Sequence, residues 1–160
     1  MTIAKGDKIP SAKLRTLTSD GPKDITTDEI FAGKTVVLFG LPGAFTPTCS
    51  AKHLPGFIEK FDALAAKGVD AIACVSVNDA FVMGAWGKSQ NAEGKVQMLA
   101  DGNADFAKAL GLDADFSAYG MGTRSKRFAL IAKDGVVQEV NVEAQGAFEV
   151  SSADYVLGQL

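Results

Sequence analysis

The sequence contains two cysteines, Cys49 and Cys74, in very different surroundings. Cys49 follows the apolar run 35–39 and stands where the next helix is expected to begin. A thiol in the first turn of a helix faces unpaired backbone N–H groups and the positive end of the helix dipole, and both favour the thiolate. We therefore predict that Cys49 is a nucleophile at the carboxyl end of a buried strand.

The residues of the loop before Cys49 limit the reactions that this thiol could carry out. A disulfide oxidoreductase would carry Cys-x-x-Cys here, but position 46 is Thr, which excludes dithiol exchange within the loop. The Thr46 hydroxyl can both accept and donate hydrogen bonds, which suits attack of sulfur on one peroxide oxygen while the other leaves as an anion. Pro42 and Pro47 restrict the loop and should shield the thiolate. The loop would therefore suit the reduction of a peroxide by Cys49.

The second cysteine and the single histidine have other interpretations. Cys74 lies within the apolar run 69–77, where a buried structural thiol is the usual occupant. His53, four positions after Cys49, suggests a Cys–His hydrolase, but the loop carries no sign of a carbonyl-binding site and His53 no evident orienting partner. Two Cys and one His are too few for a structural zinc site, and no metal or cofactor is expected.

The elements around these residues should alternate between strand and helix. Apolar spacing predicts strands at 35–39 and 69–77 joined by a helix over 57–65, a β-α-β unit whose strands run parallel. Asp-Gly at 134–135 between two apolar runs predicts an antiparallel hairpin. Other expected features are a capping box at Thr26-x-x-Glu29, a strand at 96–99, and helices beginning after Asp79, Asn103 and Ser151.

This order is that of a thioredoxin-like α/β fold, with a central mixed sheet flanked by helices, although other α/β folds share it. The 160 residues suit a single domain over 1–160. A net charge of -3 leaves no basic stripe, so nucleic acid is not expected as a partner. No apolar run reaches spanning length, so we expect a cytoplasmic protein without a membrane partner.

The motif Pro42-x-x-x-Thr46-x-x-Cys49 resembles the active site of peroxiredoxins. The string PGAFTPTCS, its continuation KHLPGF and segments onward to KRF at 126–128 resemble the atypical type II class, which includes mammalian peroxiredoxin-five and the plant type II branch. The resemblance spans almost the whole chain. It implies a catalytic arginine, matched here by Arg127, which would hold Cys49 as thiolate and, with Thr46, align the peroxide.

The resemblance also implies a function and an assembly. It predicts a thiol peroxidase that reduces hydrogen peroxide and small alkyl hydroperoxides through a Cys49 sulfenic acid, in antioxidant defence and redox homeostasis. The region of Phe45, Phe81 and Trp86 lies at a dimer interface in this family, so a homodimer is expected. The alternatives are a peroxide sensor or redox relay that uses the same Cys49, and a catalytically silent thioredoxin-like binding module.

A sulfenic acid must condense with a second thiol before further oxidation disables it. Some type II relatives carry a resolving cysteine near the C-terminus, where this chain has Ser151. Plant-type relatives have a cysteine near position 74, so a Cys49–Cys74 disulfide is possible by resemblance, but a buried strand thiol would need local unfolding to reach Cys49. We expect an external thiol, with glutathione and glutaredoxin first and thioredoxin second.

Overall fold

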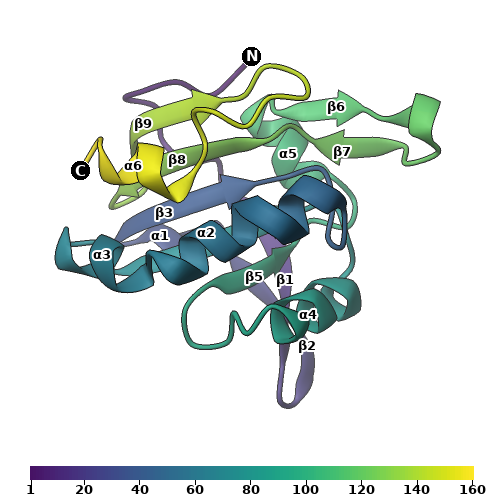
Figure 1. The fold of residues 1–160 in the computed structure, drawn as a ribbon, viewed down its shortest axis with the longest axis horizontal. Coiled ribbons are helices and arrows are strands. Elements are labelled where there is room, and N and C mark those ends of the chain that lie inside the picture. Colours follow the sequence, from purple (N-terminus) through teal and green to yellow (C-terminus); the bar gives the residue numbers. More distant parts are fainter.

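A mixed sheet of seven strands, in the order β2-β1-β5-β4-β3-β8-β9, lies between two layers of helices (Figure 1). The computed structural model describes all 160 residues. The strands are β1 (Lys13–Thr18), β2 (Gly21–Thr26), β3 (Thr35–Gly40), β4 (Ala71–Ser76), β5 (Gln97–Ala100), β8 (Phe128–Lys133) and β9 (Val136–Val142). A separate pair joins β6 (Asp113–Asp115) to β7 (Thr123–Ser125). The helices are α1 (Thr27–Phe31), α2 (Leu54–Glu59), α3 (Phe61–Ala66), α4 (Ala80–Ser89), α5 (Asp105–Leu110) and α6 (Ala153–Leu157).

The two apolar runs predicted as strands form the centre of the sheet. β3 and β4 pair in parallel, and β8 pairs with the other edge of β3 in antiparallel register. Successive side chains of a strand point to opposite faces. Val37 and Phe39 accordingly enter one hydrophobic cluster, and Val36 and Leu38 enter the other. The expected α/β class with a mixed sheet between helices is confirmed.

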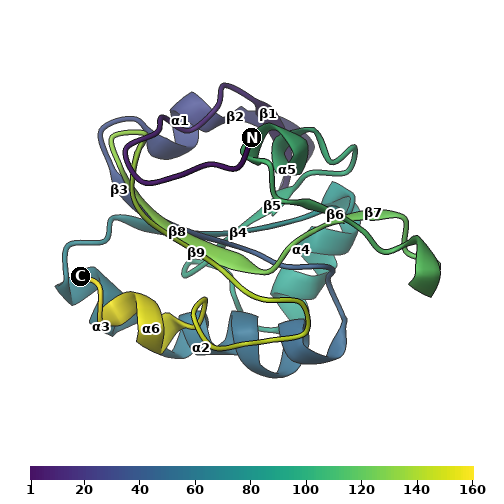
Figure 2. The ribbon, with the colours of Figure 1, turned by 90° about the horizontal axis from the view of Figure 1, so that it is seen from above.

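Each face of the sheet has its own helices (Figure 2). Residues of α2, α3, α4 and α6 form one cluster with the first face, and residues of α1 and α5 form the second cluster with the opposite face. The segment that carries Cys49 leads from β3 into α2, so it lies on the first side. No helix of the structure is both long and apolar enough to cross a membrane.

Local turn chemistry matches the sequence in several places. The Thr26 side chain caps α1 and Glu29 completes the capping box. Asp134 and Gly135 both adopt positive φ, 49° and 76°, as a two-residue hairpin turn requires, and they join β8 to β9. These short-range signals are reliable because the interacting groups are three or fewer residues apart.

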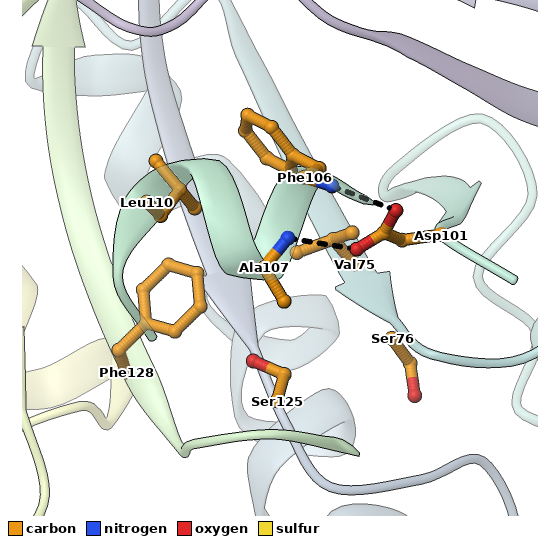
Figure 3. A pocket seen from close by; sticks show the side chains of 8 residues that line it. All are labelled: Val75, Ser76, Asp101, Phe106, Ala107, Leu110, Ser125 and Phe128. Carbon is orange, nitrogen blue, oxygen red and sulfur yellow. Dashed lines mark hydrogen bonds between the residues drawn. The ribbon is translucent and has the colours of Figure 1, made fainter. Parts of the chain in front are cut away.

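Other expectations were wrong in detail. α5 is capped by Asp101 instead of Asn103, because the Asp101 carboxylate accepts the N–H groups of Phe106 and Ala107 (Figure 3). Ser152, and not Ser151, caps α6. The helix expected over 57–65 is divided at Lys60 into α2 and α3. Asn103 and Ser151 have the right residue type, but capping depends on backbone geometry that a residue type does not determine.

Two strand pairs were not expected. The hairpin of β1 and β2 is one, and β2 has the sequence GPKDIT, in which Gly, Pro and Asp oppose strand formation. The other is the pair β6–β7, in a stretch for which no element was predicted above. Tyr119 lies between these two strands and is 69% exposed. Both pairs lie at the periphery of the molecule (Figure 1).

Candidate functional site

The helical segment that carries Cys49 contains a widened turn. Residues Cys49–His53 form a π-helical turn, in which the Leu54 N–H donates to the Cys49 carbonyl five residues earlier. Pro55 explains this widening, because proline has no N–H to donate and its ring clashes with the carbonyl four residues before it. The turn is followed directly by α2, where Pro55 occupies the first turn and is tolerated.

Arg127 lies against the sulfur of Cys49. Its Nη2 donates to Cys49 Sγ over 3.2 Å. Both residues come from the same end of the sheet, because Gly40 at the end of β3 pairs with Phe128 at the start of β8. The loop after β3 and the residue before β8 must therefore meet. Cys49 has no exposed surface, so the guanidinium acts on the sulfur with little screening by water.

The other side of the Arg127 guanidinium is held by His53. Nη1 of Arg127 lies 2.8 Å from His53 Nδ1, and His53 Nε2 lies 2.9 Å from the Ser151 carbonyl oxygen. A guanidinium can only donate and a carbonyl can only accept, so Nδ1 accepts and Nε2 carries the proton. Burial, then the nearby Arg127 charge, lower the pKa of His53 to about 3, while the bond to Ser151 opposes the shift. The imidazole is neutral.

Aromatic rings account for the burial of His53. Its ring lies 4.9 Å from Phe39, 5.8 Å from Phe57 and 5.1 Å from Phe148, measured between centroids. Phe148 also lies 5.9 Å from the guanidinium carbon of Arg127. These neighbours keep water from the imidazole, which makes protonation costly. His53 therefore serves here as a fixed acceptor for Arg127, which does not suit the base of a Cys–His hydrolase.

Thr46 and Pro42 lie in the loop before the cysteine. The Thr46 hydroxyl donates to the Gly43 carbonyl over 2.7 Å, which leaves its oxygen lone pairs to accept from another group. Pro42 is half-buried, and its carbonyl accepts from Arg124 Nη1 over 3.3 Å. The same nitrogen donates to the Val77 carbonyl after β4. Arg124 thus ties the loop to the end of the neighbouring strand.

Residues of α4 and its C-terminal end also hold the turn Cys49–His53 in place. Trp86 Nε1 donates to the Ser50 hydroxyl over 3.0 Å, and Gln90 donates to the Ser50 carbonyl over 3.2 Å. Trp86 is fully buried, whereas 58% of Phe45 and 65% of Phe81 are exposed. Of these three aromatic residues, only Trp86 belongs to the core.

Cys74 lies near Cys49 in the buried centre of the sheet. It lies in the middle of β4, paired with Phe39 of β3 and Met98 of β5, and has no exposed surface. Burial raises the pKa of the Cys74 thiol well above its ordinary value, and the nearby Cys49 adds to the rise. Both cysteines are free thiols in the structure.

The geometry thus joins Cys49 and Arg127, as expected, and places Thr46 and Pro42 in the adjoining loop. Sequence reasoning missed the supporting roles of Arg124 and of the Ser151 carbonyl, and it weighed His53 only as a base or a zinc ligand. The position of Arg124, three residues before Arg127, is only a weak sequence indication that Arg124 lies near the site. The role of the Ser151 carbonyl could not be predicted from side-chain patterns, because every residue carries the same backbone carbonyl.

Comparisons with known proteins identify the family of the chain. The family model described as Redoxin matches residues 4–157. The chain is 56% identical to the chloroplastic Peroxiredoxin-2E-2 of rice, covering 99% of this chain and 73% of that protein. It is 49% identical to Peroxiredoxin-2B of Arabidopsis thaliana, covering 99% and 98% of the two chains.

A solved structure of reduced Prx3 from Vibrio vulnificus in complex with hydrogen peroxide is also similar. It superposes with a TM-score of 0.95 at 56% identity, covering 99% of both chains. This likeness confirms the thioredoxin-like fold, and the named relatives extend over the full length of the chain. The chain therefore belongs to the Redoxin family as a type II peroxiredoxin, a thiol peroxidase that reduces peroxides.

Proposed function

We propose that Cys49 is the peroxidatic nucleophile and that Arg127 and Thr46 align the peroxide against it. The single observation that supports these roles is the Arg127 guanidinium, which donates to Cys49 Sγ and is held on its other side by a neutral imidazole. A neutral acceptor leaves the whole positive charge of Arg127 to act on the thiolate and on the departing oxygen. The exclusion of water by Pro42 and its loop strengthens that effect.

The reaction proceeds in one displacement. The Cys49 thiolate attacks the terminal oxygen of the peroxide, the S–O bond forms, and the O–O bond breaks. The second oxygen leaves as hydroxide or alkoxide, which takes a proton from solvent, so water or an alcohol is released and Cys49 becomes a sulfenic acid. The Thr46 oxygen is free to accept the peroxide O–H, since its own proton is donated to Gly43.

The substrates are hydrogen peroxide and small alkyl hydroperoxides. Cys49 has no exposed surface, and the half-buried side chains of Pro42 and Thr46 adjoin it in the same loop. A small peroxide needs little displacement of this loop, whereas a bulky substrate would have to open it. The same argument disfavours direct attack on protein disulfides.

The reductant is an external thiol, with glutathione and glutaredoxin before thioredoxin. Cys74 is held in a central strand, and the rise in its thiol pKa makes it a poor nucleophile at neutral pH. Ser151, in the position of a C-terminal resolving cysteine in some relatives, is fully buried and donates its hydroxyl proton to Glu143. Neither position favours an internal disulfide. Condensation with an external thiol then requires the turn at Cys49–His53 to open, and it releases water.

A peroxidase assay with each reductant tests these assignments. Cys49→Ser should abolish turnover, and Cys74→Ala should retain the wild-type rate with glutathione and glutaredoxin. Mass spectrometry after one equivalent of peroxide should show a Cys49 sulfenic acid or a mixed disulfide. A Cys49–Cys74 disulfide in most molecules would contradict the external reductant. Consumption that stops after about one equivalent per thiol, with both reductants supplied, would favour the sensor or relay.

The assembly we propose is a homodimer through the surface around Phe45 and Phe81. Phe45 lies in the active-site loop with its ring 6.5 Å from Trp86 of α4, and Phe81 is in the first turn of the same helix. Two largely exposed phenylalanines on adjoining segments are costly to leave in water, and a second copy of the chain would cover them. The cytoplasmic location stays a prediction.

A further inference from the structure

Glu143 concentrates four hydrogen bonds on one oxygen atom, although it has no place in the chemistry described above. Its Oε2 accepts the backbone N–H groups of Glu149, Val150 and Ser151 over 2.8, 2.9 and 2.9 Å, and the Ser151 hydroxyl over 2.6 Å. Glu143 is 8% exposed and directly follows β9. A carboxylate that accepts from four donors fixes the segment 149–151 far more closely than a single contact would.

The segment that Glu143 holds leads directly to the reacting sulfur. The Ser151 carbonyl accepts from His53 Nε2, His53 Nδ1 accepts from Arg127 Nη1, and Arg127 Nη2 donates to Cys49 Sγ. The backbone closes the circuit, because the Glu143 N–H donates to the Arg127 carbonyl over 2.9 Å. Glu143 thus restrains Arg127 twice, once at its backbone and once through its guanidinium.

We propose that Glu143 is a positioning residue for peroxide reduction. It fixes the Ser151 carbonyl, this carbonyl orients the His53 imidazole with Nδ1 facing Arg127, and the imidazole sets the guanidinium against Cys49. The inference rests on the roles proposed above for Cys49 and Arg127.

The indirect connection has an electrostatic advantage over a direct ion pair. A carboxylate in contact with Arg127 would offset the positive charge that the thiolate and the leaving oxygen need. Here the negative charge of Glu143 is taken up by backbone N–H groups and by Ser151, and a neutral imidazole stands between it and the arginine. Glu143 can therefore orient the Arg127 guanidinium through His53 without offsetting its positive charge.

The protonation state of Glu143 agrees with this role. Burial acts to raise the pKa of its carboxyl, but the hydrogen bonds from Ser151, Glu149 and Val150 outweigh burial and lower it. The group is therefore ionised at neutral pH and acts only as an acceptor, as its four donors require.

The test compares two reactions of the same sulfur. Peroxide reduction needs both the thiolate and an aligned guanidinium, whereas alkylation by iodoacetamide needs only the thiolate. Both rates are measured for Glu143→Gln at a pH where alkylation has reached its plateau, and their ratio is compared with that of the wild type. We expect the peroxide rate, and with it the ratio, to fall by about 10-fold, up to on the order of 10²-fold for a displacement near 1 Å.

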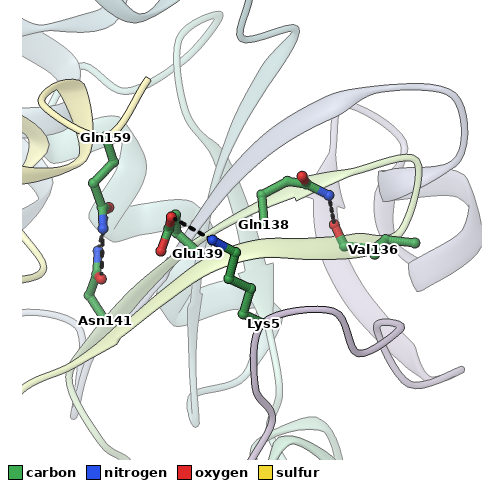
Figure 4. A network of polar contacts seen from close by, with 6 residues as sticks. All are labelled: Lys5, Val136, Gln138, Glu139, Asn141 and Gln159. Atoms are coloured by element: carbon green, nitrogen blue, oxygen red, sulfur yellow. Dashed lines mark hydrogen bonds and ion pairs between the residues drawn. The ribbon is translucent and has the colours of Figure 1, made fainter.

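Two residues of β9 supply matched controls (Figure 4). Glu139→Gln removes a carboxylate that pairs only with exposed Lys5, over 3.4 Å. Asn141→Ala removes the reciprocal amide bonds to Gln159, of 2.7 and 3.0 Å, and so loosens the C-terminal end without touching the Glu143 network. Both should keep the wild-type ratio.

Ser151→Ala provides a milder variant if Glu143→Gln fails to fold. It removes one of the four bonds to Glu143 and keeps the carbonyl, so we expect the same direction of change with a smaller size. A folded Glu143→Gln protein with a lower melting temperature but a wild-type ratio would make Glu143 a structural anchor only and overturn the inference. If Glu143→Gln is unfolded, a wild-type ratio of the two rates in Ser151→Ala would likewise overturn the inference. If Cys49→Ser still consumed peroxide, the proposed function itself would fail, which is a separate outcome.

Discussion

Nη1 of Arg127 lies 2.8 Å from Nδ1 of His53, which makes a neutral imidazole the partner of the arginine that faces the Cys49 sulfur. Arginine beside a carboxylate is the more familiar arrangement, but the negative carboxylate would offset part of the positive charge of the arginine. The imidazole orients the guanidinium and leaves the charge intact. This relationship depends on burial, because an exposed histidine would be free to protonate.

Replacement of Arg127 by lysine should lower the rate of peroxide reduction by roughly 10²–10³-fold. A lysine amine is a single point charge and cannot donate in fixed directions to both Cys49 and His53, as the planar guanidinium does. Stopped-flow measurement of the second-order rate constant with hydrogen peroxide checks this. Lys126→Gln, at the exposed neighbouring position, should react at the wild-type rate. Equal losses in both variants would contradict the role of Arg127.

We expect the free energy of unfolding to decrease as the pH is lowered below 6.5, because of His53. Its pKa is about 3 in the folded protein and near 6.5 when unfolded, so between these values only the unfolded state binds the proton. Stability is thus fully present above pH 6.5 and declines as the pH falls, by about 2 kcal/mol on reaching about pH 5. Urea unfolding at a series of pH values measures the slope. His53→Asn, which cannot titrate, should lose this part of the slope, and an unchanged slope would rule out His53 as its source.

Gly40→Ala should destabilise the protein and slow the reaction together. A Cβ at position 40 would collide with the ring of Phe128, which pairs with Gly40 next to Arg127. Overpacking of this kind costs roughly 1–3 kcal/mol, and relief of the clash would displace the start of β8. Gly56→Ala in α2 is the control: its Cβ would meet nothing within 4 Å, and removing a helical glycine should raise stability by about 0.5–1 kcal/mol. Thermal unfolding and the peroxide rate are measured for both.

Phe81→Glu should convert the proposed dimer to a monomer. Phe81 is 65% exposed, and a charge at that position would have to lose its hydration on association. Tyr155→Glu makes a comparable change at an aromatic residue of α6, 44% exposed and away from α4, and should leave the dimer intact. Sedimentation velocity distinguishes the species. A monomeric wild-type protein would contradict the proposal directly.

Much of the fold was accessible to sequence reasoning. The strands at β3, β4 and β8 followed from uninterrupted apolar runs, and the turn at 134–135 followed from Asp-Gly, whose backbone preference is local. The helix caps at Asn103 and Ser151 were misassigned because neighbouring residues compete for the same N–H groups. β2 escaped prediction because hydrogen bonding to β1, and not its own composition, makes it a strand.

The sequence by itself pointed to Cys49 as the proposed nucleophile: a thiol at the start of a helix, after a buried strand, with Thr46 where a dithiol site would need a second cysteine. Only the tertiary structure decided what surrounds that thiol. The pairing of Gly40 with Phe128 brings Arg127 to Cys49, and the fold of the C-terminal segment brings the Ser151 carbonyl to His53. Apolar periodicity identifies strands but not their partners or register. Contacts that join residues across paired strands, or through a backbone carbonyl, therefore exist only once the chain has folded.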